Sequence, residues 1–282
     1  MKIITTIKEM QTEIIKQKSQ AKSIGFVPTM GFLHEGHLAL LKKARAENDI
    51  VAMSIFVNPI QFGPNEDFST YPRDFERDRA LVECEEIDYL FHPSVEEMYP
   101  HPSSVKVTVQ SRTNVLCGTS RPGHFDGVTT VLTKLFNIML PTRAYFGKKD
   151  AQQVAVVDGM IEDFHFPIEL VPVEIVREID GLAKSSRNVY LSPEERSKAN
   201  VLYKGLQSAK KAIDEGERNP EILISQIKKL ITSESNGQID YVEILTYPHL
   251  KPLEELSGTI IIALAVKFSN VRLIDNFILE IK

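Results

Sequence analysis

The chain has 282 residues, 43% of them hydrophobic, and a formal net charge of −5 at pH 7. This length suffices to bury a substantial core in one large or two medium domains. The negative net charge excludes nucleic-acid binding through overall charge. The two cysteines, Cys84 and Cys117, are far apart in sequence, which argues against a disulfide framework and favours a reducing compartment.

The N-terminal residues 1–9 lack the long apolar core and the small-residue cleavage site of a secretory signal. No apolar run in the sequence approaches the roughly 18 residues that span a bilayer. We therefore expect a soluble, cytoplasmic protein with no membrane partner.

Strand-like and helix-like segments alternate along the first part of the chain. The run 49–57 is continuously apolar, as is typical of a strand covered on both faces. Such alternation predicts an α/β fold with a doubly wound parallel sheet, in which ligands bind beyond the carboxyl ends of the strands. The predicted strands are 23–27, 49–57, 87–91, 144–147 and 168–176, and the predicted helices are 38–48, 75–86, 128–140 and 151–164.

The pattern changes near residue 176. Ser192, Pro193 and Glu195 form the signature of a helix start, with an N-cap, a first-turn proline and a capping-box partner. A charged helix to about residue 215, a helix over 220–232 and strands over 239–245, 259–268 and 271–279 follow, with a turn at Ser269-Asn270. The sequence thus predicts two domains, 1–175 and a smaller α+β domain over 176–282.

The segment Pro-Thr-Met-Gly-Phe-Leu-His-Glu-Gly-His occupies residues 28–37, between a predicted strand and a predicted helix. A strand–turn–helix entry aims free backbone N–H groups and the helix dipole at one point, which favours an anion. Gly31 and Gly36 allow the backbone to approach a ligand, and His34 and His37 can face the same side. These features predict a phosphate site.

Other interpretations of the segment are weaker. Gly31 and Gly36 have the spacing of a P-loop, but His37 and Leu38 follow where Lys and Ser or Thr are needed. A zincin helix needs HExxH, and this segment is one residue short. Zinc binding by the histidine pair stays open, although no further Cys or His cluster completes a site. Two surface histidines at a glycine-rich turn are the plain alternative.

Polar side chains also follow the second predicted strand. Asn58 and Gln61 place neutral donors and acceptors at its carboxyl end, which suits hydroxyls and a carboxylate. A capped turn is the alternative for these two residues. Arg121 and His124, in a loop marked by proline and glycine, either meet phosphate or cover a site as a lid, unless they are simply solvated.

The segment after the predicted strand 144–147 repeats the anion-site pattern. Gly147, Lys148, Lys149 and Asp150 precede a predicted helix, where a lysine places a compact charge on phosphate. Asp150 is expected to cap that helix, and Gln153 lies one turn inside it. A plain charged turn is the alternative.

Lys184, Ser185, Ser186 and Arg187 follow a glycine turn at Asp180-Gly181. Two cations and two hydroxyls in a mobile loop can wrap a triphosphate and stabilise the charge that develops on a leaving pyrophosphate. A basic surface loop is the alternative.

Together these segments resemble the pantothenate synthetase (pantoate–β-alanine ligase) family of the HxGH nucleotidylyltransferase superfamily. An HxGH motif alone would indicate only the superfamily, whereas six segments in series are far more specific. The resemblance rests on residues 28–37, 56–62, 71–73, 121–128, 146–153 and 180–188, in order along the chain.

The resemblance implies a reaction and an architecture. ATP and pantoate form a pantoyl adenylate and release pyrophosphate; the amine of β-alanine then attacks the acyl carbon, which gives pantothenate and AMP. Magnesium accompanies the triphosphate, with no residue implied as a direct ligand. The family is usually a homodimer, with a Rossmann-like N-terminal domain and a smaller C-terminal lid domain. It belongs to coenzyme A biosynthesis.

The resemblance also implies residue roles. His34, His37, Lys149, Ser185, Ser186 and Arg187 carry the chemistry, with His37 as the proton donor. Pantoate is held by Gln61 and Gln153, with Asn58 and Met30 beside them, and Gln61 also lies near the β-alanine position. ATP contacts are Met30, Gly31, Phe32, Leu33, His34, Glu35, Gly36, His37, Gly147, Lys148, Lys149, Asp150, Val176, Lys184, Ser185, Ser186 and Arg187.

Two positions depart from the commonest family pattern, because Lys184 stands where Met is frequent and Lys148 where Glu is frequent. We expect both to tighten the hold on ATP, so that Lys184→Met raises the KM for ATP.

One rival function is an HxGH enzyme acting on a phosphate ester, which would need a second basic pocket. The other is a non-catalytic nucleotide- or RNA-binding module, and the acidic net charge argues against RNA.

Overall fold

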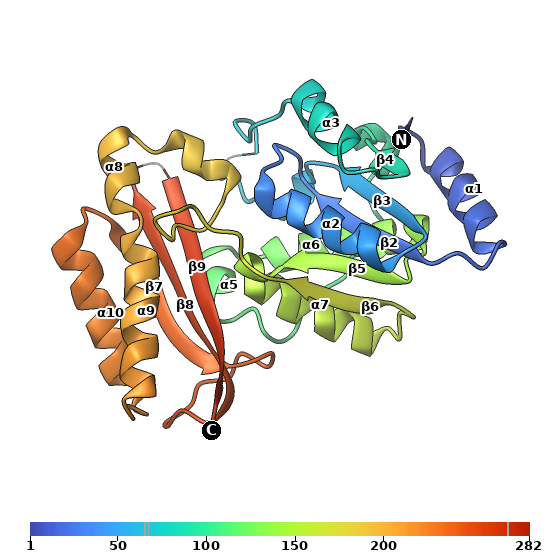
Figure 1. The fold of residues 1–282 in the computed structure, drawn as a ribbon. Helices are drawn as coiled ribbons and strands as arrows, with labels where there is room; N and C mark the ends of the chain where they lie inside the picture. Colours follow the sequence, from blue (N-terminus) through green and yellow to red (C-terminus); the bar gives the residue numbers. More distant parts are fainter. Residues whose placement is uncertain (65, 67, 270) are drawn as a thin grey trace.

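The computed structural model describes residues 1–64, 66, 68–269 and 271–282. The predicted turn at Ser269-Asn270 includes Asn270, which lies outside the described residues. Two sheets organise the chain, one of six strands and one of three (Figure 1).

The larger sheet is parallel throughout, as the alternating pattern predicts. Its strand order is β1-β4-β3-β2-β5-β6. All six residues of β3 are buried, which explains why this strand reads as a continuous apolar run. The strands are β1 (Lys2–Ile4), β2 (Ile24–Thr29), β3 (Ile50–Ile55), β4 (Tyr89–Phe91), β5 (Arg143–Gly147) and β6 (Glu169–Val173).

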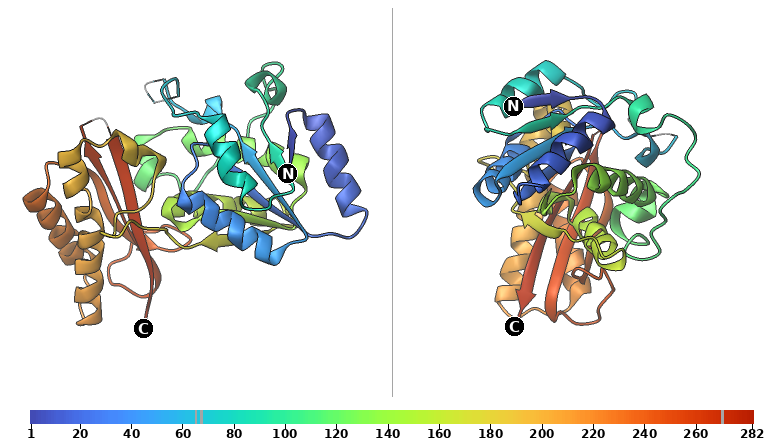
Figure 2. Two further views of the ribbon diagram at one scale, coloured as in Figure 1. Left: turned by 45° about the horizontal axis from the view of Figure 1, so that its top comes forward. Right: turned by 90° about the vertical axis from the view of Figure 1, so that its right-hand side faces the viewer.

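Helices cover both faces of this sheet (Figures 1 and 2). Side chains that alternate along each strand enter different cores, because successive residues of a strand point to opposite faces. Phe26 packs with α1 (Ile7–Lys18), α6 (His124–Met139) and α7 (Ala151–Asp163), whereas Val27 packs with α2 (Glu35–Glu47) and α3 (Phe75–Glu83). The α/β, doubly wound fold class is confirmed.

The smaller sheet is an antiparallel meander of β7 (Gln238–Thr246), β8 (Gly258–Phe268) and β9 (Val271–Ile281). One face packs against α9 (Val201–Asp214) and α10 (Pro220–Glu234). The other face packs against α7 and α5 (Leu116–Ser120), through Ala151, Ala155 and Leu116. The smaller sheet is therefore sandwiched between its own helices and the larger sheet's helical layer (Figure 2).

Some elements differ from the predictions. The charged helix expected to about residue 215 is two helices, α8 (Pro193–Lys198) and α9, because only α9 carries side chains buried against the smaller sheet. The capping box of Ser192 and Glu195 is present. Strand β1 and helix α1 were not predicted; β1 is only three residues long, and α1 buries only Met10 and Ile14. Short helix α4 (Val95–Met98) and helix α5 were also missed.

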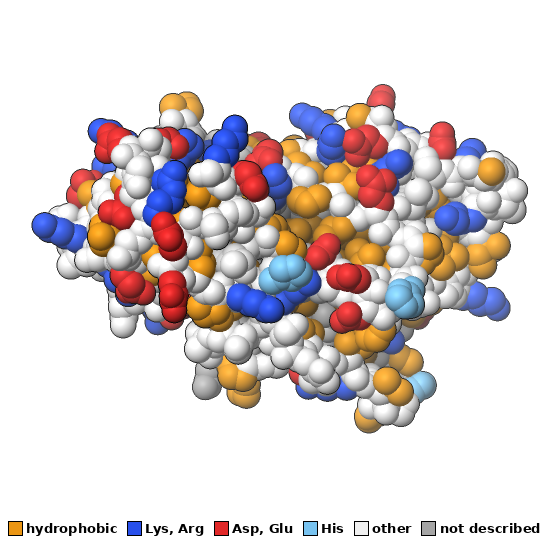
Figure 3. Space-filling model, turned by 90° about the horizontal axis from the view of Figure 1, so that it is seen from below, with side chains coloured by type: hydrophobic (Ala, Val, Ile, Leu, Met, Phe, Trp, Pro, Cys, Tyr) orange, Lys and Arg blue, Asp and Glu red, His pale blue; other side chains and the backbone are white. Residues whose placement is uncertain are grey.

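Within the described residues, the helices fall short of the length and apolar character that a membrane crossing requires. On the face seen from below, acidic and basic side chains are intermixed among apolar ones (Figure 3). That face therefore presents no basic stripe of the kind that binds nucleic acid.

Candidate active site

The site begins at the place where the strand order of the larger sheet reverses. Strand β2 lies between β3 and β5, and the chain leaves β2 toward one side and returns later on the other. Such a switch point opens a crevice beyond the carboxyl ends of the strands. The turn that carries His34 follows β2, and the turn that carries Lys149 follows β5.

A cavity of about 220 Å³ lies at this place. It is lined by fifteen of the residues that the sequence singled out: Met30, His34, Gly36, His37, Asn58, Gln61, Gly147, Lys149, Asp150, Gln153, Val176, Lys184, Ser185, Ser186 and Arg187. Among the residues that the sequence singled out, Gly31, Phe32, Leu33, Glu35, Lys148, Arg121 and His124 are not among its lining residues. The side chain of Leu33 is fully buried in the core on the α2 side of the sheet.

The two histidines are held by the turn itself. Helix α2 begins at Glu35, three residues earlier than predicted, and His34 is its N-cap. Nδ1 of His34 accepts the N–H of Gly36 at 3.1 Å, and Nδ1 of His37 accepts the N–H of His34 at 3.2 Å. A neutral imidazole that accepts at Nδ1 carries its proton on Nε2, so each ring keeps an Nε2–H donor.

Both imidazoles are neutral at pH 7. Burial and the nearby Lys149 charge lower the pKa of His34 to about 4. Burial, His34 and Lys149 hold the pKa of His37 well below its ordinary value. The ring centroids are 4.1 Å apart, so two N–H donors are presented side by side without the repulsion of two adjacent cations.

The expectation of free backbone N–H groups at this turn is wrong for Phe32 and Leu33. The carboxylate of Asp78 on α3 accepts both, at 2.6 Å from Phe32 N and 2.7 Å from Leu33 N. Asp78 is only 1% exposed, and these bonds compensate the burial of its charge. No sequence signal marks Asp78, since it reads as one more charge on a polar helix.

The two glycines of the motif are needed for reasons other than ligand approach. Gly31 has a φ of +83°, a region that disfavours residues with a Cβ. A Cβ on Gly36 would lie 2.7 Å from Cε1 of His34. Gly36 therefore makes room for the imidazole to fold back over the helix start.

Gln61 is fixed in place by buried neighbours. Its Oε1 accepts from Nδ2 of Asn58 at 3.1 Å, and its Nε2 contacts the sulfur of Met30 at 3.2 Å. Asn58, 1% exposed, also donates to the carbonyl of Gly127 and accepts from the hydroxyl of Tyr99 at 2.8 Å. The geometry makes Asn58 a residue that orients Gln61.

Arg121 and His124 close one side of this region. Glu66 binds the Arg121 guanidinium at 2.8 and 2.6 Å, so its charge is already paired. Nδ1 of His124 lies 2.9 Å from the Gln61 carbonyl and its Nε2 lies 3.0 Å from Arg121. Because a carbonyl only accepts, the His124 proton sits on Nδ1. Burial, then Arg121, lowers the pKa of His124 to about 4.

The turn after β5 brings its two lysines to different partners. The Lys148 ammonium pairs with Glu174, whereas Nζ of Lys149 lies 3.8 Å from the Asp150 carboxylate and lines the cavity. Asp150 occupies the N-cap of α7 without a side-chain hydrogen bond to it, so the predicted capping role is wrong. A 3-10 turn, η2 (Lys148–Asp150), precedes the helix and sets the Asp150 backbone outside the usual N-cap conformation.

Backbone and amide groups complete this side of the cavity. A Cβ placed on Gly147 would meet no atom within 4 Å, which leaves room for a ligand against the backbone. Gln153 lines the cavity, whereas its neighbour Gln152 is buried and pins the 112–117 segment through three hydrogen bonds.

The loop over residues 184–187 is docked on the HxGH turn. Lys184 pairs with Glu35 at 2.9 Å and Glu178 at 3.1 Å, which raises the pKa of its ammonium. The hydroxyl of Ser186 donates to the Phe32 carbonyl at 3.1 Å, and the loop residue Arg187 lies with its guanidinium 5.8 Å from the Tyr71 ring centroid. The loop is thus held against the HxGH turn and lines the cavity, and the expected effect of Lys184 on ATP binding stays a prediction.

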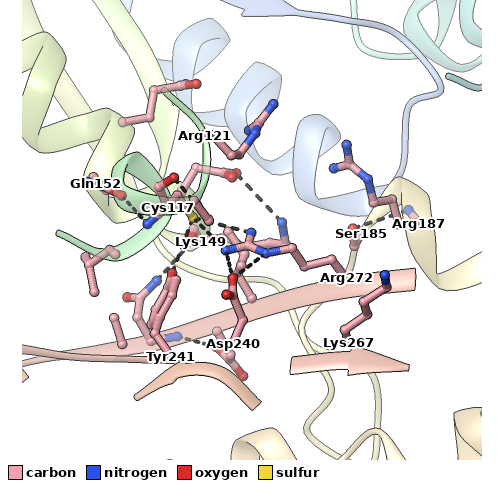
Figure 4. A pocket seen from close by; sticks show the side chains of 18 of the residues that line it. Cys117, Arg121, Lys149, Gln152, Ser185, Arg187, Asp240, Tyr241, Lys267 and Arg272 are labelled. Atoms are coloured by element: carbon pink, nitrogen blue, oxygen red, sulfur yellow. Dashed lines mark hydrogen bonds and ion pairs between the residues drawn. The ribbon is translucent and has the colours of Figure 1, made fainter. Parts of the chain in front are cut away.

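A second cavity of about 1000 Å³ adjoins the first and extends to the smaller sheet. Lys149 lines both cavities. Figure 4 shows Lys149 together with Arg187 from the loop and Lys267 and Arg272 from the smaller sheet. In the part of the chain that the structure describes, no three His, Cys, Asp or Glu side chains are grouped to hold a metal ion.

A doubly wound sheet with an HxGH turn, a lysine turn and a hydroxyl-rich loop at one switch point defines an α/β protein of the class that binds ligands beyond the carboxyl ends of its strands. Residues 2–278 match the model of the pantoate-beta-alanine ligase family. The chain therefore belongs to this family.

Relatives and solved structures match this chain along nearly its whole length. The pantothenate synthetase of Geobacillus sp. (strain WCH70) is 66% identical, with 100% of both chains covered, and that of Bacillus cereus (strain ATCC 10987 / NRS 248) is 60% identical at the same coverage. The crystal structure of pantothenate synthetase from Thermus thermophilus superposes with a TM-score of 0.93 at 45% identity, covering 98% of this chain and 99% of its own.

A second solved structure carries small molecules. The pantoate-beta-alanine ligase of Francisella tularensis, complexed with beta-gamma ATP and beta-alanine, has a TM-score of 0.80 at 36% identity and covers 98% of this chain and 97% of its own.

Proposed function

We propose that this chain condenses (R)-pantoate with β-alanine at the expense of ATP, through a pantoyl adenylate, and releases AMP and pyrophosphate. The observation that carries this proposal is the cavity at the switch point, where His34, His37, Gln61, Lys149 and Gln153 meet in a member of the ligase family. The ligands of the Francisella tularensis enzyme support ATP and β-alanine as substrates.

Repulsion between negatively charged reactants limits the first step. A pantoate carboxylate oxygen attacks the α-phosphorus of ATP, the bond to the β-phosphate oxygen breaks, and pyrophosphate leaves. All reactants are anionic, so positive groups and donors must meet the charge that develops on the leaving group. We assign this role to the Nε2–H groups of His34 and His37, to Lys149, and to the 184–187 loop with its hydroxyls and Arg187.

The part of the cavity that we assign to pantoate needs neutral hydrogen-bonding groups in place of positive charge. Gln61 and Gln153 line the cavity with neutral amides, which suit pantoate's hydroxyls and carboxylate. Arg121, the nearby guanidinium, is paired with Glu66. A second phosphate group would meet little free positive charge there, so these neighbours support pantoate over a phosphate-ester acceptor.

In the second step the β-alanine amine attacks the acyl carbon of the adenylate, and the bond from that carbon to the AMP oxygen breaks. Water would hydrolyse the same anhydride, so a docked cover over the cavity protects the intermediate. The contacts of Lys184 with Glu35 and of Ser186 with the Phe32 carbonyl support that cover role.

The division into domains, the oligomeric state and the metal ion are also part of the proposal. We assign residues 1–175 to an ATP- and pantoate-binding domain and residues 176–282 to a lid domain, in a cytoplasmic homodimer. Magnesium would accompany the triphosphate and would supply neutralisation of phosphate charge; the described residues offer no cluster of side chains to hold it. Light scattering of the purified protein measures the oligomeric state, and a monomeric mass would contradict the dimer.

Pantoate-dependent ATP–pyrophosphate exchange tests the proposed function. Labelled pyrophosphate should enter ATP only when pantoate is present, and without β-alanine. Exchange that a phosphate-ester acceptor supports and pantoate does not would favour the rival nucleotidylyltransferase, and ATP binding without exchange would favour a non-catalytic module.

A further inference from the structure

Asn276, on strand β9 of the smaller sheet, contacts the lysine turn of the larger sheet. Its side-chain Nδ2 donates to two backbone carbonyls, Lys148 O and Lys149 O, each at 2.9 Å. Asn276 is 4% exposed. One buried amide thus uses both of its hydrogens on the turn that presents the Lys149 ammonium to the cavity.

Its neighbour Asp275 contacts the segment that leads into the 184–187 loop. Asp275 is 2% exposed, and its carboxylate binds the Arg177 guanidinium at 2.6 and 2.9 Å. Arg177 also donates to the Gly181 carbonyl at 3.0 Å, and its backbone pairs with Ala183. Ala183 directly precedes Lys184, so this ion pair anchors the base of the 184–187 loop.

Strand geometry explains how adjacent residues reach two segments. Asn276 pairs with Ala263, which packs against α7, and Asp275 pairs with Leu264, which packs on the α9 side. Directly opposite residues of an antiparallel pair share a face, and neighbours along a strand alternate faces. Asp275 and Asn276 therefore project from opposite faces of β9, one toward each segment.

We propose that Asp275-Asn276 is a positioning pair that fixes the lysine turn and the 184–187 loop relative to each other. The proposal rests on the function proposed above, in which both segments meet the ATP phosphates. Both residues line the larger cavity, but the Asp275 carboxylate is engaged by Arg177 and Nδ2 of Asn276 by the carbonyls of Lys148 and Lys149. They act through Lys149 and through the 184–187 loop, and a small displacement of such groups is costly to turnover.

The test uses Asn276→Asp in the full-length protein. The substitution keeps the side-chain volume but turns a carboxylate oxygen toward two carbonyl oxygens, so the turn should shift. We expect kcat/KM for ATP to fall about 10- to 100-fold, with the KM for pantoate changed by less than about threefold. Asn276→Ser, which keeps one donor, should fall between this variant and the native protein and provides a second variant if the carboxylate impairs folding.

A double-mutant cycle separates positioning from general stability. In a Lys149→Ala background, Asn276→Asp should have little further effect on kcat/KM for ATP, because the group it positions is gone. Glu280→Gln is the matched control on the same strand, at an exposed position whose carboxylate accepts from the Thr259 hydroxyl of β8. It should leave both KM values and the melting temperature unchanged.

Three results would overturn the proposal, and the third would also affect the proposed function. Full multiplicative losses in the double variant, or a lower melting temperature with unchanged KM and kcat, would make Asn276 a purely structural residue and leave the proposed function intact. Native turnover in Lys149→Ala itself would remove the role assigned to Lys149, and with it both the site assignment and this inference.

Discussion

Hydrogen bonds from nearby backbone N–H groups to Nδ1 of each ring fix the orientation of the His34 and His37 side chains. Because backbone N–H groups occupy Nδ1 of His34 and of His37, the tautomer is fixed before ATP arrives. Neutral rings avoid the cost of two adjacent buried cations, and each still keeps an Nε2–H donor for the phosphate that we propose. A zinc ion bound through both Nδ1 atoms would have to break these two hydrogen bonds of the turn.

At the residue scale the sharpest test of the site is Lys149→Ala. Removing one preorganised donor to developing charge typically costs about 10²- to 10³-fold in rate. We expect that loss in kcat. The Lys149 ammonium lies 3.8 Å from the Asp150 carboxylate, and so long an ion pair contributes little stability.

The measurement is steady-state kinetics with thermal unfolding of the same preparation. Lys204→Ala, which replaces an exposed lysine of α9 paired with Glu234 of α10, is the control and should keep native kinetics. Near-native turnover in Lys149→Ala would remove Lys149 from the mechanism.

At the element scale, Asp78 shows how one helix shapes the turn of another. The α3 carboxylate holds the N–H groups of Phe32 and Leu33, directly before the N-cap His34. Asp78→Ala leaves the buried N–H of Leu33 and the part-buried N–H of Phe32 without their acceptor, and a buried unsatisfied group costs about 1–3 kcal/mol. We expect a lower free energy of unfolding together with a lower kcat.

Urea denaturation and kinetics at a temperature where the variant is folded measure the two effects separately. Glu76→Ala, one of the acidic residues in the first turn of the same helix, is the control. A folded Asp78→Ala protein with native kcat would show that the turn keeps its shape without the carboxylate.

The 184–187 loop gives a second prediction at this scale. Lys184→Met removes the contacts to Glu35 and Glu178 and one positive charge at the cavity. Both losses weaken the closed position of the loop, so the KM for ATP should rise while the melting temperature changes little, because exposed or half-exposed ion pairs contribute little stability. An unchanged KM for ATP would show that Lys184 does not act on the nucleotide.

Most elements of the larger sheet could be predicted from the sequence because hydrophobic period and turn residues are local signals. The same signals placed the His34 turn, the Lys149 turn and the 184–187 loop at strand ends, and parallel topology alone brings such ends together. Asp78 and Asn276 were missed, because the contacts that give them importance join segments 45 or more residues apart. Composition carries no signal for such partners.

At the scale of the whole molecule, the buried histidines make stability depend on pH. The folded pKa values of His34 and His124 are about 4, below the ordinary value near 6.5. The unfolded chain therefore binds more protons between these limits, so the stabilisation is fully present above about pH 6.5 and is lost as pH falls toward 4. The loss is on the order of 1–2 kcal/mol per histidine by pH 5.

Urea unfolding at pH 7, 6 and 5 measures how steeply the free energy of unfolding changes with pH. His124→Gln should flatten this dependence, whereas His101→Gln, at an exposed loop position, should not. Equal slopes in the native protein and His124→Gln would contradict the burial of a neutral imidazole at that position.

The arrangement of the two sheets has a consequence for the reaction as a whole. The smaller sheet packs on α7 through Ala151 and Ala155, while its strand β9 binds the turn just before that helix. In the proposed function, substrates would meet groups from both parts of the chain across the adjoining cavities of about 220 and 1000 Å³. A site of this kind can enclose an anhydride between two steps.

Mass spectrometry of the intermediate tests the central claim most directly. The protein, incubated with magnesium, ATP and pantoate but no amine, is quenched and analysed for the mixed anhydride of pantoate and AMP. We predict an adenylate in amounts approaching one per active site, which disappears with formation of pantothenate when β-alanine is added. Pantothenate formed with no adenylate at any time after mixing, or ADP in place of AMP as the nucleotide product, would contradict the account.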